Sequence, residues 1–384
     1  MGDGTFGQIV KIAFINDTIF DYASGAPFAV GGAERQQWLL ARALAAAGWS
    51  VSVGVFDTIR AGETLTLEGV NFTGMSRPRS HALAAWCRFL AVERPTWLYW
   101  RGANHLLGPS TAIARILGIR TIFSAAVDSD VTPKVALFQR PRWWRLYAWG
   151  LYWADRIFVQ HGWQLSALPV KLRSKAFLVP SIAESISIAR HHDERTPYLA
   201  WVGQLRQPKR PDLLIDMARQ SPDVRYVVCG GPSAFRTPAR YTEDVTTALR
   251  SLPNVDYRGQ VSPTEAQKVI AEAAALISTS DEEGFPNTFL QAWSSGTPVI
   301  SLKIDPDHVI ERRGLGVVSG DINTAATIVR NLIQHPDERE RIAHRARRYV
   351  KEYHSAAAVT AVFNQAVSGA SFQDHCALMS SGDG

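Results

Sequence analysis

Short apolar runs rich in β-branched residues alternate along the chain with longer segments whose apolar residues recur every three to four positions. The runs predict buried strands, and the longer segments predict helices that cover them. In the first half the predicted strands are 9–15, 51–55, 98–100, 121–124, 157–160 and 177–179. The predicted helices between them are 33–47, 81–93, 109–117 and 135–153. Buried strands joined through helices run parallel, so this half predicts a parallel sheet covered on both faces.

The alternation stops at about 180–197, in a polar stretch, and then begins again. The second set of predicted strands is 198–202, 226–229, 255–257, 275–278 and 299–302. We therefore predict an α/β fold with two Rossmann-like parallel-sheet domains facing a central cleft, because ligands in such sheets bind beyond the carboxyl ends of the strands. The predicted boundaries are an N-terminal, acceptor-side domain at 1–182, a linker at 183–197, a C-terminal domain at 198–354, a helix at 355–368 that packs back on the N-terminal domain, and a flexible tail at 369–384.

Composition narrows the class of protein. With 46% apolar and 20% charged residues, the chain is not a disordered one. No apolar run approaches the roughly 18 residues that span a bilayer, and residues 1–15 fit a leader and a strand better than a signal peptide. The three widely spaced cysteines fit neither a disulfide framework nor a zinc site. We expect a cytoplasmic protein, with peripheral attachment to the inner face of the membrane as the alternative. The net charge of +6 suits an anionic ligand or an anionic membrane surface.

The clearest motif lies at 281–292, between the predicted strand 275–278 and the residues Gly296, Thr297 and Pro298. Gly284 and Pro286 shape a tight turn there, and a helix that starts near Asn287 would direct its unbonded N–H groups toward a ligand. Glu283 stands just before this helix, where a carboxylate can accept hydrogen bonds from sugar hydroxyls. The alternative is a capping loop at an ordinary turn between a strand and a helix.

This segment resembles the E-x7-E region of GT-B glycosyltransferases, specifically the retaining glycosyltransferase family 4 (glycosyl transferases group 1). Three further segments agree in order: 31–35 resembles the Gly-Gly loop of the family, 201–212 its G-R-L…K segment, and 257–261 the strand and glycine beside the nucleobase. The resemblance extends over residues 9–368. It implies retaining transfer of a sugar from a nucleotide sugar to a glycan, a lipid-linked acceptor or a small molecule, in polysaccharide or glycoconjugate biosynthesis. It also implies no cofactor and no metal ion.

The resemblance implies particular roles. Lys209 would hold the donor diphosphate and stabilise the leaving nucleotide, and Glu283 would position the donor sugar. Many family members have a histidine near the loop at 123–130, but this sequence has none there. Asp128 or Asp130 would take an orienting role instead, and Asp128 is the third catalytic candidate. The leaving phosphate itself would deprotonate the acceptor, which removes the need for a strong protein base. The implied donor-binding residues are Gly31, Gly32, Gln204, Arg206, Lys209, Val261, Glu283, Gly284, Phe285, Pro286, Asn287, Thr288 and Gln291. A solvated loop lysine at Lys209 and a simple helix-entry turn at Gly32 are the structural alternatives.

Two positions depart from the family pattern. Gln291 replaces the second glutamate of E-x7-E, so a hydrogen bond to the ribose would lose its charge assistance. Gln204 replaces an arginine, which removes a permanent cation from the diphosphate site, and Arg206 or Arg210 would have to compensate. These changes weaken or retune donor binding.

Polar residues at strand ends in the first half are the acceptor candidates. Arg101 could hold an anionic acceptor, His105 and His161 could hydrogen-bond a hydroxyl, and Asp130 lies in the same loop as Asp128. A strand-end salt bridge, packed histidines and a loop carboxylate that caps the next element are the alternatives. Asp128 and Asp130 also match a D-x-D metal string, which we discount because GT-B proteins usually need no metal ion.

Residues 140–153 interleave arginines with aromatic residues and hold four of the twelve tryptophans, Trp143, Trp144, Trp149 and Trp153. One interpretation is a core helix with arginines on its exposed face. The other is a basic amphipathic helix that makes peripheral contact with a membrane or a lipid acceptor. No nucleic-acid motif accompanies the segment, so we predict no nucleic-acid partner.

Two other functions remain open at this level. One is a nucleotide-sugar-binding protein with little catalysis, which Gln204 and Gln291 favour. The other is a GT-B enzyme of different nucleotide-sugar chemistry, such as epimerisation, against which the element from Glu283 to Gln291 argues.

Overall fold

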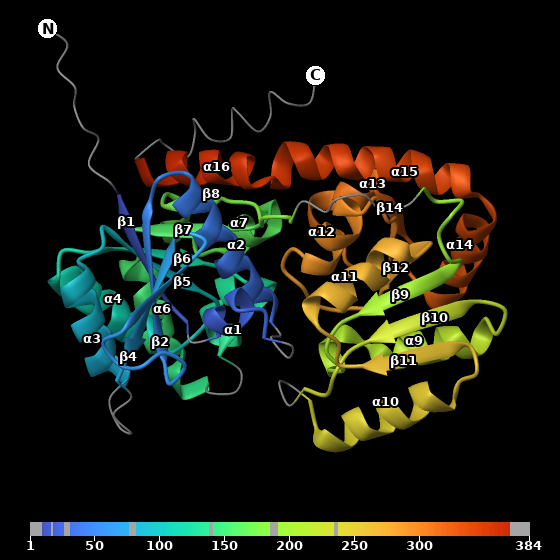
Figure 1. Ribbon diagram of the computed structural model, residues 1–384, viewed down its shortest axis with the longest axis horizontal. Coiled ribbons are helices and arrows are strands. Elements are labelled where there is room, and N and C mark those ends of the chain that lie inside the picture. The colour runs from blue at the N-terminus through green and yellow to red at the C-terminus, as the bar shows by residue number, and fades with distance from the viewer. Residues whose placement is uncertain are drawn as a thin grey trace, which may run out of the picture. The chain divides into compact units, whose positions relative to one another are not determined.

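The computed structural model describes residues 10–16, 18–26, 31–76, 82–137, 141–184, 191–233 and 237–368 (Figure 1). They form two compact units, one from the described parts of 1–26, 30–179 and 359–384 and one from the described part of 180–358. Each unit has its own sheet. The predicted tail at 369–384, the leader at 1–9 and part of the predicted linker, 185–190, lie outside the described residues.

The first unit contains an eight-stranded sheet with the order β3-β4-β2-β1-β5-β6-β7-β8. All neighbouring strands are parallel except β3 and β4, which are antiparallel. The strands are β1 (Lys11–Ile15), β2 (Ser50–Phe56), β3 (Thr64–Leu67), β4 (Val70–Met75), β5 (Trp97–Arg101), β6 (Arg120–Ser124), β7 (Arg156–Val159) and β8 (Ala176–Leu178). The apolar runs did not predict β3 and β4, because β3 is a largely exposed edge strand and β4 alternates buried with half-buried residues.

Helices cover both faces of this sheet. They are α1 (Ile19–Ala23), α2 (Gly32–Ala46), α3 (Ala82–Glu93), α4 (Leu107–Ile116), α5 (Pro133–Ala136), α6 (Trp144–Trp153), α7 (Gly162–Ala167), α8 (Val170–Arg173) and α16 (Ala356–Ser368). Side chains of α3, α4 and α6 share one core with Ala13 and Ile15 of β1. On the other face, Trp38 of α2 packs on Phe72 with ring centroids 6.0 Å apart, and Phe363 of α16 packs on Phe158 at 5.3 Å.

The prediction of one helix over 135–153 is wrong. α5 ends at Ala136 and Leu137 is in a turn, whereas a separate 3₁₀ turn at Pro141–Trp143 leads into α6. Proline disfavours the helical conformation in the residue before it and has no N–H to donate, so it starts a helix more readily than it continues one. Arg140, the first basic residue of the predicted helix, lies outside the described residues. α6 then crosses α4 closely, since a Cβ atom on Gly150 would stand 2.7 Å from the backbone nitrogen of Gly108.

The second unit contains a six-stranded parallel sheet with the order β11-β10-β9-β12-β13-β14. The strands are β9 (Tyr198–Val202), β10 (Arg225–Cys229), β11 (Val255–Gly259), β12 (Ala275–Ser278), β13 (Val299–Ser301) and β14 (Gly316–Val318). Sequence order reverses between β9 and β12, and such a reversal opens a crevice at the carboxyl ends of the two strands. β14 was not predicted, because it has three half-buried residues and begins with glycine.

Alternate residues of β9 face two different cores. Leu199 and Trp201 face a core that includes α9 and α14, whereas Tyr198 and Ala200 face a core that includes α11 and α12. The helices of this unit are α9 (Pro211–Gln220), α10 (Ala239–Ser251), α11 (Pro263–Glu272), α12 (Asn287–Ser294), α13 (Val309–Arg313), α14 (Ile322–Gln334) and α15 (Pro336–Tyr349) (Figure 1). The sheet is therefore covered on both faces, as its continuous apolar strands predict.

Candidate functional site

The loops that follow β9 and β12 lie side by side, because these strands are neighbours at the reversal of the second sheet. Asp281 N donates to Pro208 O at 2.9 Å. Thr279 Oγ1 donates to Lys209 O at 2.7 Å and accepts from Trp201 Nε1 at 3.0 Å. Four residues from two loops are thus tied together directly above the switch point of the sheet.

Lys209 and Glu283 form an ion pair at this point, Nζ to Oε1. The lysine ends a 3₁₀ turn, Gln207–Lys209, and the left-handed conformation of Arg210 (φ 50°) then directs the chain into α9. Only 16% of the Lys209 side chain and 9% of the Glu283 side chain are exposed. The structure thus brings together a cation suited to phosphate and a carboxylate suited to hydroxyl groups, two residues predicted for those tasks.

The N-terminus of α12 begins at Asn287, as predicted, directly after the Glu283 loop. Pro286 occupies the N-cap and offers no side-chain hydrogen bond to the first turn. The backbone amides of Asn287 and Thr288 belong to this turn, whose N–H groups carry the positive end of the helix dipole. An anionic group beside this helix end would be stabilised.

Other members of the predicted donor set have structural partners. Phe285 packs on Trp293 and His354, with ring centroids 6.1 and 4.9 Å away, so its ring belongs to the core of the second unit. Gln291 lies one turn into α12 and is buried. Val261 follows β11 and packs against the same core as Phe285.

Neighbouring charges decide which arginine could replace the cation missing at Gln204. Arg210 donates to both carboxylate oxygens of Asp212 at 2.8 to 3.1 Å and to Asp281 Oδ2 at 2.9 Å. These hydrogen bonds raise the pKa of Arg210 further, so its charge is already compensated. Arg206, whose backbone N–H donates to Gln204 O at 2.8 Å, remains the candidate of the two.

An open recess of about 420 Å³ lies beside the ion pair. The same two loops, the start of α9 and α10 line it, through Gln207, Pro208, Arg210, Asp212, Tyr241, Asp281 and Glu282. Its lining includes neither Lys209 nor Glu283, so the recess flanks the pair rather than containing it.

The Gly-Gly loop of the first unit leads into α2. Gly31 has φ 132°, a conformation that side-chain-bearing residues rarely adopt, and Gly32 is the first residue of the helix. The carboxylate of Glu34 lies against Gly31 in the space that a Cβ atom would need. A carboxylate in this position is favourable because the N-terminus of a helix is its positive end.

The ends of β5, β6 and β7 bring the predicted acceptor residues together. Arg101 closes β5 and donates to Ser124 Oγ of β6 at 3.0 Å. His161 Nε2 lies 2.8 Å from Asp128 Oδ1. The sequence did not single out Gln164, whose Nε2 donates to Asp128 Oδ1 at 3.0 Å, although its place one turn after His161 on α7 was a usable signal.

Asp130 is buried, and its carboxylate is hydrogen-bonded to the backbone of its own loop. Its Oδ2 accepts from the backbone N–H groups of Ala126 and Val127 at 2.7 and 3.1 Å. Burial raises its pKa to about 6, although these hydrogen bonds and the charge of Arg101 act in the opposite direction. Asp128 and Asp130 therefore have different partners, and the capping interpretation describes Asp130.

The two predicted histidines differ in their surroundings. His161 is buried, and its Nδ1 has no hydrogen-bond partner among the described residues. His105 is half-buried, and its ring lies 5.6 Å from that of Trp143. Trp143 in turn precedes α6, so the predicted acceptor residues adjoin the basic aromatic segment.

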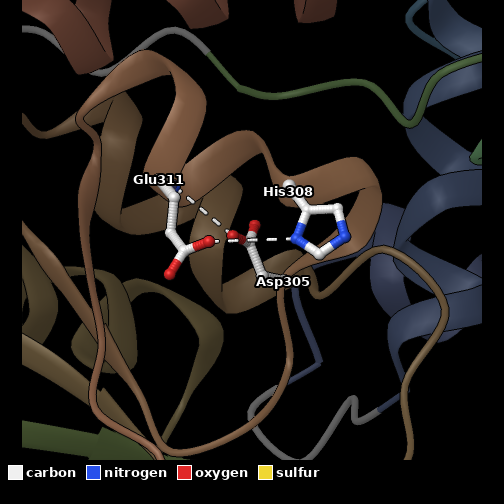
Figure 2. Close-up of side chains that lie close together, drawn as sticks. All are labelled: Asp305, His308 and Glu311. Atoms are coloured by element: carbon white, nitrogen blue, oxygen red, sulfur yellow. Dashed lines mark hydrogen bonds and ion pairs between the residues drawn. The ribbon is translucent and has the colours of Figure 1, made fainter.

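One group of side chains in the described part of the chain has the composition of a metal site. Figure 2 shows Asp305, His308 and Glu311, whose ligand atoms lie within 4.8 Å of one another. Asp305 Oδ1 accepts from Ile310 N at 2.8 Å and Oδ2 from Glu311 N at 3.3 Å, so its carboxylate satisfies backbone N–H groups in the first turn of α13, which begins at Val309. The other two side chains are exposed.

Within the described ranges, no helix combines the length and the apolar character needed to cross a membrane.

Part of the chain is similar in sequence to known glycosyltransferases. Residues 196–335 match the family model of glycosyl transferases group 1, a segment that contains both Lys209 and Glu283. The D-inositol 3-phosphate glycosyltransferase of Corynebacterium diphtheriae is 30% identical over 115 residues, which are 28% of this chain and 27% of that protein. The sulfoquinovosyl transferase of Arabidopsis thaliana is 27% identical over 181 residues, 45% of this chain and 34% of that protein. The matches thus span about a third or less of these relatives.

Solved structures match nearly the whole chain. Sucrose-phosphate synthase from Thermosynechococcus elongatus superimposes with a TM-score of 0.70 at 17% identity, covering 93% of this chain and 98% of that one. Anabaena HepE in complex with UDP and glucose gives 0.71 at 14% identity, covering 94% and 99%. These likenesses confirm the predicted GT-B fold of two Rossmann-like units. The domain match and the curated relatives support the prediction of a glycosyl-transferring enzyme.

Proposed function

We propose that this protein is a retaining glycosyltransferase that moves a sugar from a nucleotide sugar to a hydroxyl group of an acceptor. The observation that carries the proposal is the Lys209–Glu283 pair at the switch point of the second sheet, within the segment that matches the glycosyl transferases group 1 model. One side chain suits the phosphates of such a donor and the other suits its sugar.

The donor side belongs to the second unit in this proposal. Lys209 and the first backbone amides of α12 stabilise the negative charge that develops on the diphosphate as the bond to the anomeric carbon breaks. The acceptor oxygen forms the new bond to that carbon on the same face, and the departing phosphate oxygen takes the acceptor proton. Glu283 holds the sugar hydroxyls, and Gln291 holds the ribose with a neutral amide.

The acceptor side belongs to the first unit. Asp128 is fixed by His161 and Gln164, so its carboxylate is held in one orientation and can position an acceptor hydroxyl. Arg101 adds a positive charge at the end of the neighbouring strand. We take UDP-sugars as the first donors to test, since HepE was solved with UDP.

A thermal-shift screen of UDP-, GDP-, ADP- and dTDP-sugars tests donor binding, because a bound ligand stabilises the folded state in proportion to RT ln(1 + [L]/Kd). Hydrolysis or transfer products of the best donor are then measured for the parent chain and for Lys209→Met. A selective shift together with turnover that Lys209→Met abolishes supports the proposal. A shift without turnover in the parent favours a nucleotide-sugar-binding protein, and no shift with any of the four overturns the proposal.

A further inference from the structure

Helix α6 carries a solvent-facing row of aromatic and basic residues. Trp149, Tyr152 and Trp153 are between 37% and 47% exposed, which is unusual for large aromatic side chains. Arg145 is exposed as well. At 100° per residue these four positions fall within about 100° of one another around the helix. The row is therefore one continuous face, opposite Tyr147 and Leu151, which are fully buried.

The end of α4 extends this surface. Arg115 lies over the ring of Trp153, with its guanidinium carbon 6.0 Å from the ring centroid. The next residues, Ile116 and Leu117, are 84% and 41% exposed. We call this surface the aromatic face and define it by these residues: Arg115, Ile116, Leu117, Arg145, Trp149, Tyr152 and Trp153. Exposed apolar residues that gather on one surface in this way mark a site of interaction.

The part of the sequence that contributes the aromatic face carries a net positive charge. Residues 94–183 contain twelve Lys or Arg but only three Asp or Glu, an excess of nine positive charges, whereas the whole chain has +6. The rest of the chain is therefore slightly negative. Of the three acidic residues, Asp128 is engaged by His161, Asp130 is buried, and Asp155 accepts from Thr121 N at 2.8 Å.

We propose that the aromatic face binds the surface of an anionic lipid bilayer, with α6 lying along the interface. Tryptophan and tyrosine favour the headgroup region, where the ring is buried and the N–H or O–H stays hydrated. Exposed aliphatic side chains such as Ile116 gain from contact with acyl chains, and the surrounding Lys and Arg attract acidic headgroups. This combination fits a helix that lies on a membrane.

Charge argues against a second copy of the chain as the occupant. In a twofold dimer the same surface of both copies is in contact, so the positively charged arginines of one copy would face those of the other and repel them. The proposal is also independent of the donor site. If the proposed function holds as well, the bilayer would lie near the predicted acceptor residue His105, whose ring is 5.6 Å from Trp143 at the start of α6.

Co-sedimentation of the full chain with vesicles tests the proposal directly. One set of vesicles is pure phosphatidylcholine, and in the other about a third of the lipid is phosphatidylglycerol. We expect at least about tenfold stronger binding to the anionic set, and weaker binding at roughly 0.5 M NaCl because salt screens surface charge. Equal binding to both sets, or no binding to either, overturns the proposal.

Substitutions locate the binding surface. Trp149→Gln combined with Trp153→Gln should reduce binding to anionic vesicles about tenfold, whereas Leu65→Gln, an exposed apolar residue on the edge strand β3, should leave it unchanged. If the double tryptophan substitution lowers the melting temperature, Ile116→Gln on α4 tests the same surface independently, and it should also weaken binding to anionic vesicles. Unchanged binding in both aromatic-face variants, or equal loss in the Leu65 control, contradicts the proposal.

Charge variants and the state of association complete the test. Arg142→Gln with Arg145→Gln should weaken binding to anionic vesicles, and Arg240→Gln with Lys268→Gln, which removes two exposed cations of the second unit, should not. Sedimentation velocity in the absence of lipid should show no dimer that depends on the aromatic face. A dimer that the tryptophan variant dissociates would assign this face to a second copy and overturn the membrane proposal.

Discussion

In the second unit, the reversal of the sheet brings Lys209 and Glu283 into contact, whereas in the first unit the ends of β5 to β7 carry Asp128 held by His161 and Gln164. A lysine and the N-terminal amides of a helix suit a ligand that carries and develops negative charge. A carboxylate held by an imidazole and an amide suits the orientation of a hydroxyl. Two sheets of similar architecture therefore present different chemistry at the ends of their strands, and this difference is the basis of the proposed division into donor and acceptor sides.

Each unit also contains buried ionisable groups whose pKa values are shifted, and the shifts have opposite consequences at low pH. The first buries a carboxyl group, Asp130, whose pKa burial raises to about 6. The second buries two imidazoles, His192 and His354, whose pKa values burial lowers to about 4. Through these three groups, acid should stabilise the surroundings of Asp130 and destabilise the surroundings of His192 and His354.

The largest expected effect is the loss of Lys209. Lys209→Met should reduce turnover about a thousandfold, the upper range for removing one electrostatic contact to a developing negative charge. Steady-state kinetics with the donor found by thermal shift gives the measurement. Lys303→Met is the matched control, since this exposed lysine contacts Asp281 in the neighbouring loop at 3.7 Å.

Removal of Lys209 also leaves Glu283 without its ion-pair partner, which costs stability. Melting temperatures and Lys209→Arg, which keeps the charge, separate the two effects. If Lys209→Met folds normally and retains turnover, the cation has no catalytic role. The difference between the two sheets would then no longer support a donor side in the second unit.

Opposite responses to pH come next. The folded-state pKa of Asp130 lies above the unfolded value, so its contribution is most favourable below about pH 4 and up to about 3 kcal/mol is lost as pH rises to about 6. For His192 and His354 the folded-state pKa lies below 6.5, so stability present above that pH is lost as pH falls toward about 4. In Asp130→Asn, the free energy of unfolding should no longer show the decrease over pH 4–6 that Asp130 causes. In His354→Gln, the free energy of unfolding should decrease less as the pH is lowered.

Hydrogen–deuterium exchange resolves these responses by unit. Peptides around Asp130 should gain protection as pH is lowered from about 6 to about 4, after correction for intrinsic exchange, while peptides around His192 and His354 lose it. Parallel behaviour in both units would contradict the contrast in burial.

An intermediate effect is expected at Asp128. Asp128→Asn keeps the shape of the side chain but removes the charge that orients an acceptor hydroxyl, so kcat should fall about a hundredfold. The KM for the donor should change little, because the donor is assigned to the other unit. Ser129→Ala in the same loop is the control. A rise in donor KM with an unchanged kcat would move Asp128 to the donor side.

The smallest expected effect is an increase in the affinity for nucleotide. Gln291→Glu restores the charge at the position where the family pattern has its second glutamate, so it should tighten nucleotide binding by roughly three- to tenfold through charge-assisted hydrogen bonds to the ribose. Isothermal titration with UDP and the selected donor measures it, with Gln267→Glu on α11 as a control for added negative charge nearby. Weaker binding would mean that the buried site is built for a neutral amide.

Much of the fold follows from local sequence signals. Apolar runs located eleven of the fourteen strands in the described residues and predicted the division into two sheets, since a strand buried on both faces must be apolar along its length. The edge strand β3, its partner β4 and the short β14 were missed, because half-exposed strands have weaker signals. The motifs around Lys209 and Glu283 could also be found in the sequence, because residues adjacent in the chain encode a turn and the start of a helix.

Contacts between distant residues were decided only by the tertiary structure. Arg210 looked like a replacement cation, yet Asp212 and Asp281 neutralise it, and Asp281 comes from a loop 71 residues away. Asp128 meets His161 across 33 residues because β6 and β7 are neighbours in the sheet. Periodicity and motifs determine which segments form strands and helices, because those signals are local. Which polar side chains meet at the strand ends depends on strand order and loop packing, which join residues that no local pattern connects.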